Sequence, residues 1–568
     1  MNPVELRANG GAQETYGATL VVRNLVGLEE QDALGPGGGA PRTFESRNPA
    51  NLDDLVAVAP RSGAEDVRRA CEAAARAAAG WADTPVETRA ELLRRAAALF
   101  ATHRATLAHL VAREIGKALW AADGEVGEAI GLSGFYGNGA WHLRGVLAPT
   151  IAPMRDNLVV RRPVGPVGAI TAGNFPLAVP MWKLYPALLA GNPVVWKPSE
   201  DAPGTAYVIG RIFQAAGLPP GVLNVVHGYG AGEAGEALVG ALETGALRMF
   251  AFTGSTRVGR HIGEVAGRNL VVPVLELGGK NPIVILEDAA VEEAAVSAAR
   301  AAFVLCGQRC TSTGNVIVDR KVARPVRDKI VEWSEAIRIG DPILDREAWF
   351  GPLIGPRFLA GFEAHLDWGR AGGARLATRQ SGRMTGASRP AGFTGDPERG
   401  VYVWPAVWEG VLPEMRLARE EIFGPTVNVI EVDGLDAALA AATAPGYGLT
   451  AAIFTRSPRA ARRFAERIGA GMTGVNQSGA GGAGLPFGGN GLSGNGTREL
   501  GPWALEHYTR WQALSVGFPG DEPADPPLPP IPAPIADAGD FAALVPPPPA
   551  EAAASPRSPG TPSSPPRG

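Results

Sequence analysis

Residues 193–228, PVVWKPSEDAPGTAYVIGRIFQAAGLPPGVLNVVHG, contain two short apolar runs, 193–197 and 222–227, on either side of a longer segment. Each run has the length of a buried strand. Three further runs of this kind, each followed by a helix or a Gly-rich turn, lie at 167–171, 248–253 and 271–275. Strands that alternate with helices predict a mostly parallel sheet that helices cover on both faces.

The same alternation continues on both sides of this region. Two segments rich in Ala, Leu, Arg and Glu, residues 66–81 and 86–117, precede it and are typical of helices. A second series of short apolar runs follows at 282–286, 315–318, 427–431 and 451–455. The sequence therefore predicts an α/β fold with two doubly wound domains.

The two ends of the 568-residue chain differ from its middle. Residues 1–40 include the stretch GPGGG and have weak periodicity, so we expect an N-terminal extension there. Residues 519–568 are dominated by Pro, Ala and Ser. Such a segment buries too little apolar surface to offset its ordering entropy, which predicts a disordered tail.

The overall composition favours neither a nucleic-acid-binding nor a membrane protein. The formal net charge is −4, and no apolar run reaches the roughly 18 residues needed to span a bilayer. The three cysteines, Cys71, Cys306 and Cys310, are too few for a disulfide framework, which predicts a cytoplasmic location. Cys306 and Cys310 lack the second ligand pair of a zinc site, so we expect no metal.

Two Gly-containing turns are candidates for holding a dinucleotide. Gly230, Gly232 and Gly235 form GxGxxG after a predicted strand, a pattern found both in dinucleotide-binding turns and in ordinary strand-to-helix turns. FTGSTRVG, residues 252–259, places a Gly-Ser-Thr turn at the start of a helix. Backbone N–H groups at such a turn suit a phosphate, although a simple N-cap by Ser255 has the same pattern.

A third motif, VVWKPSE, places Lys197 and Glu200 at the carboxyl end of a strand. Doubly wound sheets bind nucleotides at this edge. The carboxylate of Glu200 can accept hydrogen bonds from ribose hydroxyls and would repel a 2′-phosphate. We therefore expect NAD as cofactor, with NADP the less favoured alternative.

Three other residues are candidates for the chemistry itself. Cys310, in GQRCT, is a nucleophile if its thiol ionises, but a lone cysteine is more often a buried structural thiol. Glu276, in VLELGGKNP, follows a predicted strand and is either a base or a solvated turn residue. Asn174, in ITAGNFPL, either stabilises an oxyanion or shapes a turn.

Together, and in this order, these motifs resemble the aldehyde dehydrogenase superfamily. The resemblance covers residues 45–516 and also includes EEIFGP, LPFGG, RELG and HYTRWQ. It implies oxidation of an aldehyde to a carboxylic acid with NAD(P). It further implies a cofactor-binding domain at 41–144 and 164–277, a catalytic domain at 278–502, and an arm at 145–163 and 503–518 that joins subunits into a homodimer or homotetramer.

The resemblance also implies a role for each matching residue. Cys310 is the expected nucleophile, Glu276 the general base and Asn174 the oxyanion-hole amide, while Lys183 and Glu499 relay protons to the base. In this family the pyrophosphate does not lie on a GxGxxG turn. The residues expected to bind the cofactor are instead Lys197, Glu200, Gly228, Gly254, Ser255, Glu421 and Phe423.

Four residues are expected to contact the substrate. Trp182 and Phe487 are the expected aromatic walls, and Arg309 is a candidate partner for a substrate carboxylate. GQRCT is similar to the antiquitin branch, which handles aminoadipate semialdehyde and uses an acidic residue on an earlier helix; Glu128 is the candidate here. An Arg309–Glu128 ion pair could equally be structural, so carboxylate-bearing semialdehydes and aromatic or aliphatic aldehydes both stay open.

Two other functions are weighed against this one. Acylating relatives, which pass the thioester to coenzyme A, generally lack a carboxylate at the position of Glu276. A non-catalytic protein on the same fold would not need Cys310, Glu276 and Asn174 together. The chain also departs from many members at Gly173, where an aromatic residue is common, which indicates a roomy pocket.

Overall fold

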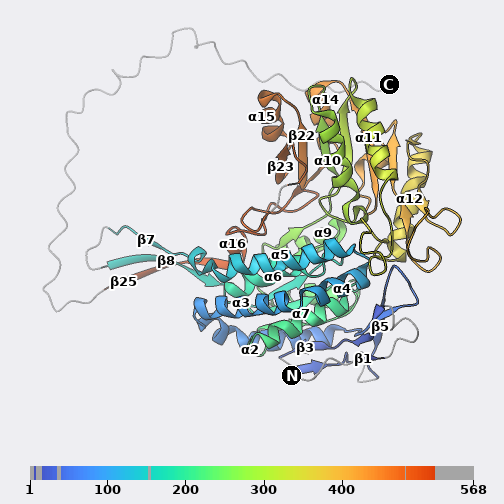
Figure 1. Cartoon of the computed structure of the whole chain (residues 1–568). Helices are drawn as coiled ribbons and strands as arrows, with labels where there is room; N and C mark the ends of the chain where they lie inside the picture. The colour runs from blue at the N-terminus through green and yellow to red at the C-terminus, as the bar shows by residue number, and fades with distance from the viewer. Residues whose placement is uncertain are drawn as a thin grey trace, which may run out of the picture. The chain divides into compact units, whose positions relative to one another are not determined.

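The computed structural model describes residues 6–7, 16–27, 29–34, 40–150, 155–479 and 482–517. The chain divides into two compact units, Met1–Val146 with Val159–Leu514 and Leu147–Leu158 with Ser515–Gly568. The first unit contains two α/β domains, which confirms the predicted fold class (Figure 1). The tail expected to be disordered lies outside the described residues.

A seven-stranded sheet, in the order β13-β12-β9-β10-β11-β3-β4, forms the first domain. Its parallel strands are those predicted from the apolar runs: β9 (Val167–Ile170), β10 (Val194–Lys197), β11 (Leu223–Val225), β12 (Met249–Thr253) and β13 (Val274–Glu276). The chain runs from β9 to β10 and β11 on one side, then crosses to β12 and β13 on the other. The order therefore reverses between β9 and β12, where doubly wound sheets bind ligands.

The described part of residues 1–40 belongs to the sheets of this domain. Strands β3 (Asn24–Val26) and β4 (Glu29–Gln31) continue the large sheet in antiparallel fashion beside β11. Strand β2 (Thr19–Val21) joins β1, β5 and β6 in a four-stranded sheet; their bounds are Leu6–Arg7, Thr43–Arg47 and Leu55–Pro60. The segment expected to precede the domain is thus integrated into it, because Leu25 and Val26 bury their side chains in its core.

Helices cover both faces of the large sheet. On one face pack α2 (Ala64–Asp83), α8 (Ala234–Gly240) and α9 (Thr256–Arg268). On the other pack α3 (Val86–Thr102), α4 (Arg104–Ile115), α5 (Leu119–Gly137), α6 (Ala178–Leu189) and α7 (Pro203–Ala215). Side chains alternate along β10, so Val194 and Trp196 face one core and Val195 the other. The single helix expected at 86–117 is two helices, because His103 leaves the helical conformation.

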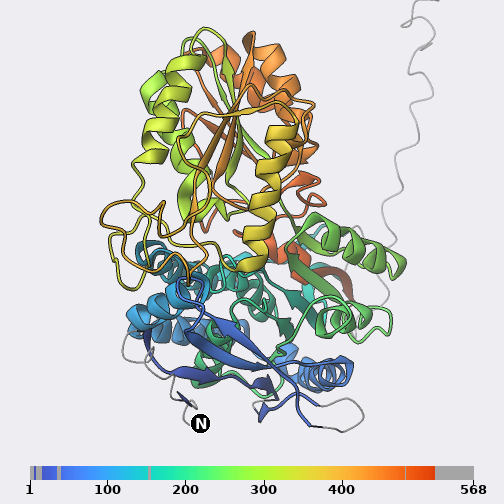
Figure 2. The same ribbon diagram turned by 90° about the vertical axis from the view of Figure 1, so that its right-hand side faces the viewer.

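The second domain repeats this plan with the sheet order β16-β19-β20-β15-β14-β22-β23. The strands are β14 (Asn281–Ile285), β15 (Thr313–Asp319), β16 (Arg375–Leu376), β19 (Ala406–Glu409), β20 (Thr426–Val432), β22 (Thr450–Phe454) and β23 (Met472–Val475). Helices α10 (Val291–Phe303) and α11 (Ala323–Glu335) lie on one side of the sheet, and α14 (Gly434–Thr443) lies on the other (Figure 2). Helix α12 (Pro356–Ala371) belongs to the same domain.

The segments expected to form an arm are strands. β8 (Arg155–Pro163) pairs with β25 (Thr509–Gly517), which follows the short helix α16 (Ala504–Tyr508), and with β7 (Val146–Ala148). In the first unit the Arg161 guanidinium lies 4.0 Å from the ring centre of Trp511. In the second unit Ser515 Oγ donates to Asn157 Oδ1 at 2.7 Å. Among the helices described, none has the length and apolar character needed to cross a bilayer.

Candidate active site

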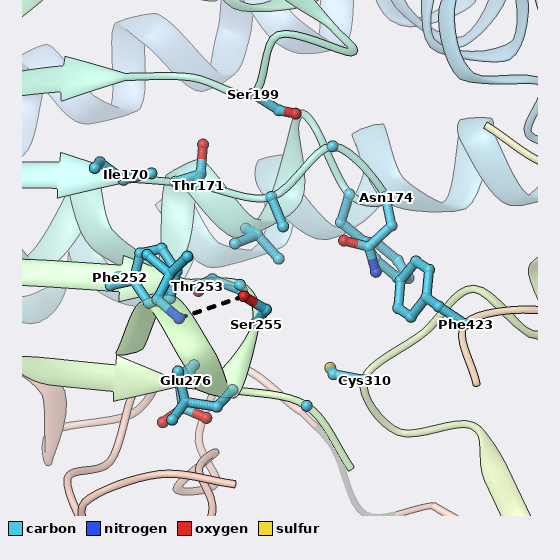
Figure 3. Close-up of a pocket in the computed structure, with 18 of the residues that line it drawn as sticks. Ile170, Thr171, Asn174, Ser199, Phe252, Thr253, Ser255, Glu276, Cys310 and Phe423 are labelled. Carbon is cyan, nitrogen blue, oxygen red and sulfur yellow. Dashed lines mark hydrogen bonds between the residues drawn. The ribbon is translucent and has the colours of Figure 1, made fainter. Parts of the chain in front are cut away.

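A cavity of about 1350 Å³ lies at the carboxyl ends of β9, β10 and β12. Residues of the second domain form part of its wall. Most of the residues predicted from the sequence line it: Glu128, Asn174, Trp182, Lys197, Glu200, Gly254, Ser255, Glu276, Arg309, Cys310, Glu421, Phe423 and Phe487. Figure 3 places Asn174, Glu276, Cys310 and Phe423 around the same space. Lys183, Glu499 and Gly228 do not line the cavity.

Cys310 lies in the turn between α10 and β15. Before it, Leu305 and Cys306 both have a φ of 56°, and Gly307 has a φ of 68°. A Cβ on Gly307 would lie 2.1 Å from the carbonyl oxygen of Gly424, so only glycine fits there. The chain thus uses an uncommon left-handed turn to bring Cys310 to the cavity.

Asn281, the first residue of β14, holds this turn in place. Its Nδ2 donates to the carbonyl oxygens of Cys310 at 2.7 Å and Ser312 at 2.8 Å, and its Oδ1 accepts the N–H of Thr450 at 3.0 Å. Sequence reasoning did not assign Asn281 a role. The only signal was its place in ELGGKNP, next to the predicted base.

The thiol of Cys310 is protonated in this state. Burial, together with the nearby carboxylates of Glu276 and Glu421, raises its pKa to about 12, although Arg309 and the N–H of Thr311 act in the opposite direction. Ionisation therefore requires a base or an added positive charge in the cavity.

Asn174 follows β9, and its amide is oriented by the nucleophile's own loop. Nδ2 donates to the carbonyl oxygen of Gln308 at 3.0 Å. Because a primary amide has two N–H donors, one remains for another acceptor beside Cys310. The side chain is 8% exposed, so this donor lies in a desolvated site.

A buried ion pair supports the turn that carries Asn174. Glu125 accepts the N–H groups of Leu177 at 2.7 Å and Ala178 at 2.9 Å, at the start of α6. Its other oxygen binds Lys117, whose Nζ lies 3.8 Å from the ring centre of Phe175. Neither charged residue was singled out from the sequence, because the turn lies more than fifty positions away in the chain.

Glu276 is the last residue of β13, and its buried carboxyl group lies near that of Glu499. Burial raises its pKa well above the usual carboxyl value, the negative charge of Glu499 adds to this, and Lys183 opposes it. Neither carboxylate oxygen has a hydrogen-bond partner within the described part of the chain. Lys183 forms an ion pair with Glu499. The two predicted relay residues thus lie together, close enough to Glu276 to shift its pKa, but they do not line the cavity.

At the other end of the cavity, Lys197 is the last residue of β10 and Glu200 lies in the loop that follows. Lys197 Nζ donates to the carbonyl oxygens of Pro198 at 2.6 Å and Gly228 at 2.8 Å, and lies 3.7 Å from Glu200. Gly228 therefore orients Lys197 instead of facing the cavity itself. Glu200 also pairs with Arg357 of α12, a residue that the sequence motifs did not identify.

The start of α9 faces the same space. Ser255 is its N-cap and accepts the N–H of Val258 at 3.5 Å, and the N–H of Gly254 donates to the carbonyl oxygen of Glu276 at 3.0 Å. Ser255 thus acts as an N-cap, which was one of the two interpretations of this motif. The other interpretation, a turn that binds a phosphate, is compatible with the cap because the helix N-terminus lies at the cavity wall.

Glu421 and Phe423 come from the second domain. Glu421 accepts the N–H of Gly279 at 3.1 Å, and burial raises its pKa to about 7. A Cβ on Gly278 would overlap the Glu421 carboxylate, which explains a glycine there. The ring of Phe423 lies 5.9 Å from that of Phe358, so the two form an aromatic wall.

The substrate side is partly as expected. The rings of Trp182 and Phe487 lie 4.5 Å apart, and Trp182 Nε1 donates to Glu128 at 2.8 Å. Arg309 donates to the carbonyl oxygen of Ala301 at 3.0 Å and its Nε has no partner among the residues described. The ion pair considered between Arg309 and Glu128 does not form. Glu128 accepts the indole N–H of Trp182 instead, and burial raises the pKa of Glu128, which disfavours its charged form.

No group of three metal-ligating side chains converges anywhere in the described residues. Cys71 and Cys306 are buried and form no disulfide. The site therefore combines a buried thiol, an amide donor and a carboxylate with raised pKa in a cavity at the carboxyl edge of a parallel sheet.

Comparison with known proteins agrees with this arrangement. The profile of the Aldehyde dehydrogenase family matches residues 38–514. An alpha-ketoglutaric semialdehyde dehydrogenase of Bacillus subtilis is 35% identical over 470 residues, 83% of this chain and 93% of that protein. An alpha-ketoglutarate semialdehyde dehydrogenase of Haloferax volcanii is 37% identical over 469 residues, 82% and 94% of the two chains. The crystal structure of an NAD-dependent aldehyde dehydrogenase from Sinorhizobium meliloti superposes with a TM-score of 0.81 at 32% identity, covering 89% of this chain and 96% of that one.

Proposed function

Since the chain belongs to the aldehyde dehydrogenase family, we propose that it oxidises an aldehyde to a carboxylic acid with NAD through a thioester on Cys310. The observation that carries this proposal is that Cys310, Asn174 and Glu276 line one cavity. These three side chains supply a nucleophile, an oxyanion donor and a base.

The cavity fits a dinucleotide. It is long enough to reach from Cys310 to Glu200, and the α9 N-terminus at Ser255 offers N–H groups between these ends. Lys197 and Glu200 would bind the adenine ribose, while Glu421 and Phe423 would hold the nicotinamide end. When bound, the nicotinamide supplies the hydride acceptor that an aldehyde oxidation requires.

The first chemical task of the protein is to add a thiolate to the aldehyde carbon. The proton of Cys310 must leave before attack, and we assign its removal to Glu276, which lines the same cavity and acts electrostatically on the thiol. The carbonyl oxygen then becomes an oxyanion, which the free N–H of Asn174 stabilises. One such donor contributes about 3–4 kcal/mol in comparable sites.

The second task is to hydrolyse the thioester that remains after hydride loss. Glu276 accepts a proton from water as the water attacks the acyl carbon. The raised pKa of Glu276 makes its carboxylate a stronger base near neutral pH. The buried pair of Lys183 and Glu499 lies behind Glu276 and can carry the proton away.

Replacement of the nucleophile tests this mechanism directly. We expect Cys310→Ala and Cys310→Ser to lose at least about 10³-fold in kcat while keeping the fold and the affinity for NAD. NADH formation is followed at 340 nm, and NAD binding is measured by calorimetry. Turnover that survives in a folded, NAD-binding Cys310→Ala variant would refute the proposal.

Water, rather than coenzyme A, is the proposed acyl acceptor, because a carboxylate occupies position 276. Product analysis with and without coenzyme A distinguishes the two. We expect free acid in both reactions. An acyl-coenzyme A product would assign the chain to the acylating class instead.

For the substrate we propose a semialdehyde that carries a carboxylate. Two relatives that are 35% and 37% identical are named for such a substrate, and Arg309 borders the cavity beside Cys310 with an unpartnered Nε in the described structure. Charge-assisted hydrogen bonds to a carboxylate contribute about 1.5–3 kcal/mol. Arg309 is therefore the residue we expect to select the charged substrate.

Paired substrates test this assignment. Succinic semialdehyde and butanal have the same carbon chain but differ in the terminal carboxylate. We expect Arg309→Met to lower kcat/KM for succinic semialdehyde by about 10- to 100-fold and to change kcat/KM for butanal by less than about threefold. An equal loss on both substrates would mean that Arg309 only supports the nucleophile's loop.

We further propose a cytoplasmic homodimer or homotetramer. The unpaired thiols of Cys71, Cys306 and Cys310 support a reducing compartment. Strand β25 lies at the edge of its sheet with mostly exposed side chains, which supports pairing with another subunit. Light scattering coupled to size-exclusion chromatography measures the assembly.

A further inference from the structure

Four charged side chains meet at the Glu200 end of the cavity. Arg357 Nη1 lies 2.9 Å from Glu200 Oε1, and its Nη2 contacts Asp201. Lys197 Nζ lies 3.7 Å from the other oxygen of Glu200. Two basic and two acidic side chains therefore face one another in this group.

Arg357 reaches this group from the other domain. It lies in the first turn of α12, whereas Lys197 is the last residue of β10, and Glu200 and Asp201 belong to the loop that follows. Its guanidinium lines the cavity. The salt bridge raises the pKa of Arg357, and the charges of Lys197 and Arg357 hold the pKa of Glu200 below its usual value, so both stay ionised at neutral pH.

The backbone leaves room for this arrangement. A Cβ on Gly173 would lie 2.9 Å from both Asp201 Oδ2 and Ser199 Oγ. A larger residue at position 173 would displace the loop that carries Asp201. The contact between Asp201 and Arg357 therefore depends on a glycine at position 173.

We propose that Arg357 is a specificity-determining residue that lets this site accept a 2′-phosphate, so that the enzyme uses NADP as well as NAD. This inference rests on the proposed function, because it places an adenine ribose at Glu200. The carboxylate of Glu200 by itself would repel a phosphate dianion. The charge of Arg357 cancels that repulsion without removing the carboxylate that accepts hydrogen bonds from the ribose of NAD.

Equilibrium binding in a Cys310→Ala background tests the proposal without turnover. Calorimetric Kd values for NAD and NADP are compared for the parent, Arg357→Gln, Arg357→Lys and a control, Arg370→Gln. Arg370 lies on the same helix, is exposed and pairs only with Asp367 in the described structure. We expect Arg357→Gln to raise the Kd of NADP about tenfold or more and that of NAD less than about threefold, while Arg357→Lys and Arg370→Gln stay near the parent.

A double variant distinguishes an effect of the Arg357 charge from a general disturbance of the fold. The double variant Glu200→Gln with Arg357→Gln removes one charge of each sign, so the NADP-to-NAD ratio of Kd values should return to within about threefold of the parent. Equal effects of Arg357→Gln on both cofactors, or no return in the double variant, would overturn the proposal. A parent that binds NAD but not NADP would overturn it as well and leave the proposed function intact, whereas a parent that binds neither would contradict the proposed function.

Discussion

Burial sets the ionisation of each reacting side chain. The thiol of Cys310 and the carboxyl of Glu276 both have pKa values raised by desolvation; the charge of Glu276 also raises the pKa of Cys310, and the charge of Glu499 raises that of Glu276. Each group must lose its proton to act. Both groups therefore hold their protons more tightly than usual, and we expect proton removal toward Lys183 and Glu499 to be part of turnover.

Replacing Glu276 separates the two halves of the reaction. In Glu276→Gln, we expect hydrolysis of the acyl-enzyme to slow by about 10²–10⁴-fold, because no base activates water. In the parent, hydrolysis should rise with pH through a range above the usual carboxyl pKa, since only the deprotonated form acts; in the variant this dependence should vanish. Mass spectrometry detects the accumulated acyl-enzyme. Hydrolysis in the parent that is already constant below pH 5 would contradict the raised pKa.

Turns, rather than the regular elements, place the chemical groups. The left-handed turn at Leu305, Cys306 and Gly307 presents the nucleophile, and the turn between β9 and α6 presents Asn174. Each turn is held by a side chain from elsewhere: Asn281 bonds the carbonyl of Cys310, and Glu125 caps the start of α6. The geometry of the site therefore depends on buried polar groups outside it.

Removing the charge of Glu125 tests this dependence. Glu125→Gln leaves the ammonium of Lys117 buried without its partner, which costs about 3–5 kcal/mol in comparable pairs. We expect a lower melting temperature and a fall in kcat that exceeds any rise in KM, because the Asn174 turn shifts. The exposed pair of Lys321 and Glu287 provides the control: Lys321→Met should change stability by less than about 1 kcal/mol. Unchanged stability in Glu125→Gln would refute the supporting role.

For the molecule as a whole, stability should depend on buried neutral histidines. His227 is 1% exposed, neither ring nitrogen has a partner in the described structure, and burial, aided by Lys197, lowers its pKa to about 3. Between pH 6.5 and about 3 the unfolded chain binds a proton at this position and the folded chain does not. Stability is therefore lost as the pH falls through this window, by about 1.4 kcal/mol per pH unit.

His227→Leu removes this loss. We expect the variant's stability relative to the parent to increase by about 2 kcal/mol between pH 6.5 and pH 5, as measured by the urea midpoint at each pH. His261→Leu, at an exposed position, is measured in parallel to show the effect of replacing a histidine outside the core. A constant difference for His227→Leu would contradict the lowered pKa.

Local patterns in the sequence were enough to predict the central parallel strands of both sheets, and the motifs contain Cys310, Glu276 and Asn174, which the structure brings to one cavity. Strand length and alternation are short-range properties, and each motif, such as FTGSTRVG or ELGGKNP, carries its own turn and its reacting group within a few residues. The N-terminal strands escaped prediction because they are short and gain their stability only by pairing with β11 and β6.

The tertiary structure alone decided which charges meet. Arg357 and Glu200 are 157 positions apart, and no spacing rule relates them. The same holds for Lys183 with Glu499, and for the absence of the Arg309–Glu128 pair, in which Glu128 instead accepts from the neighbouring Trp182. A sequence specifies the chemical type of each side chain, but contacts between distant residues depend on how the two sheets face each other and on which partner lies within reach of a long, flexible side chain.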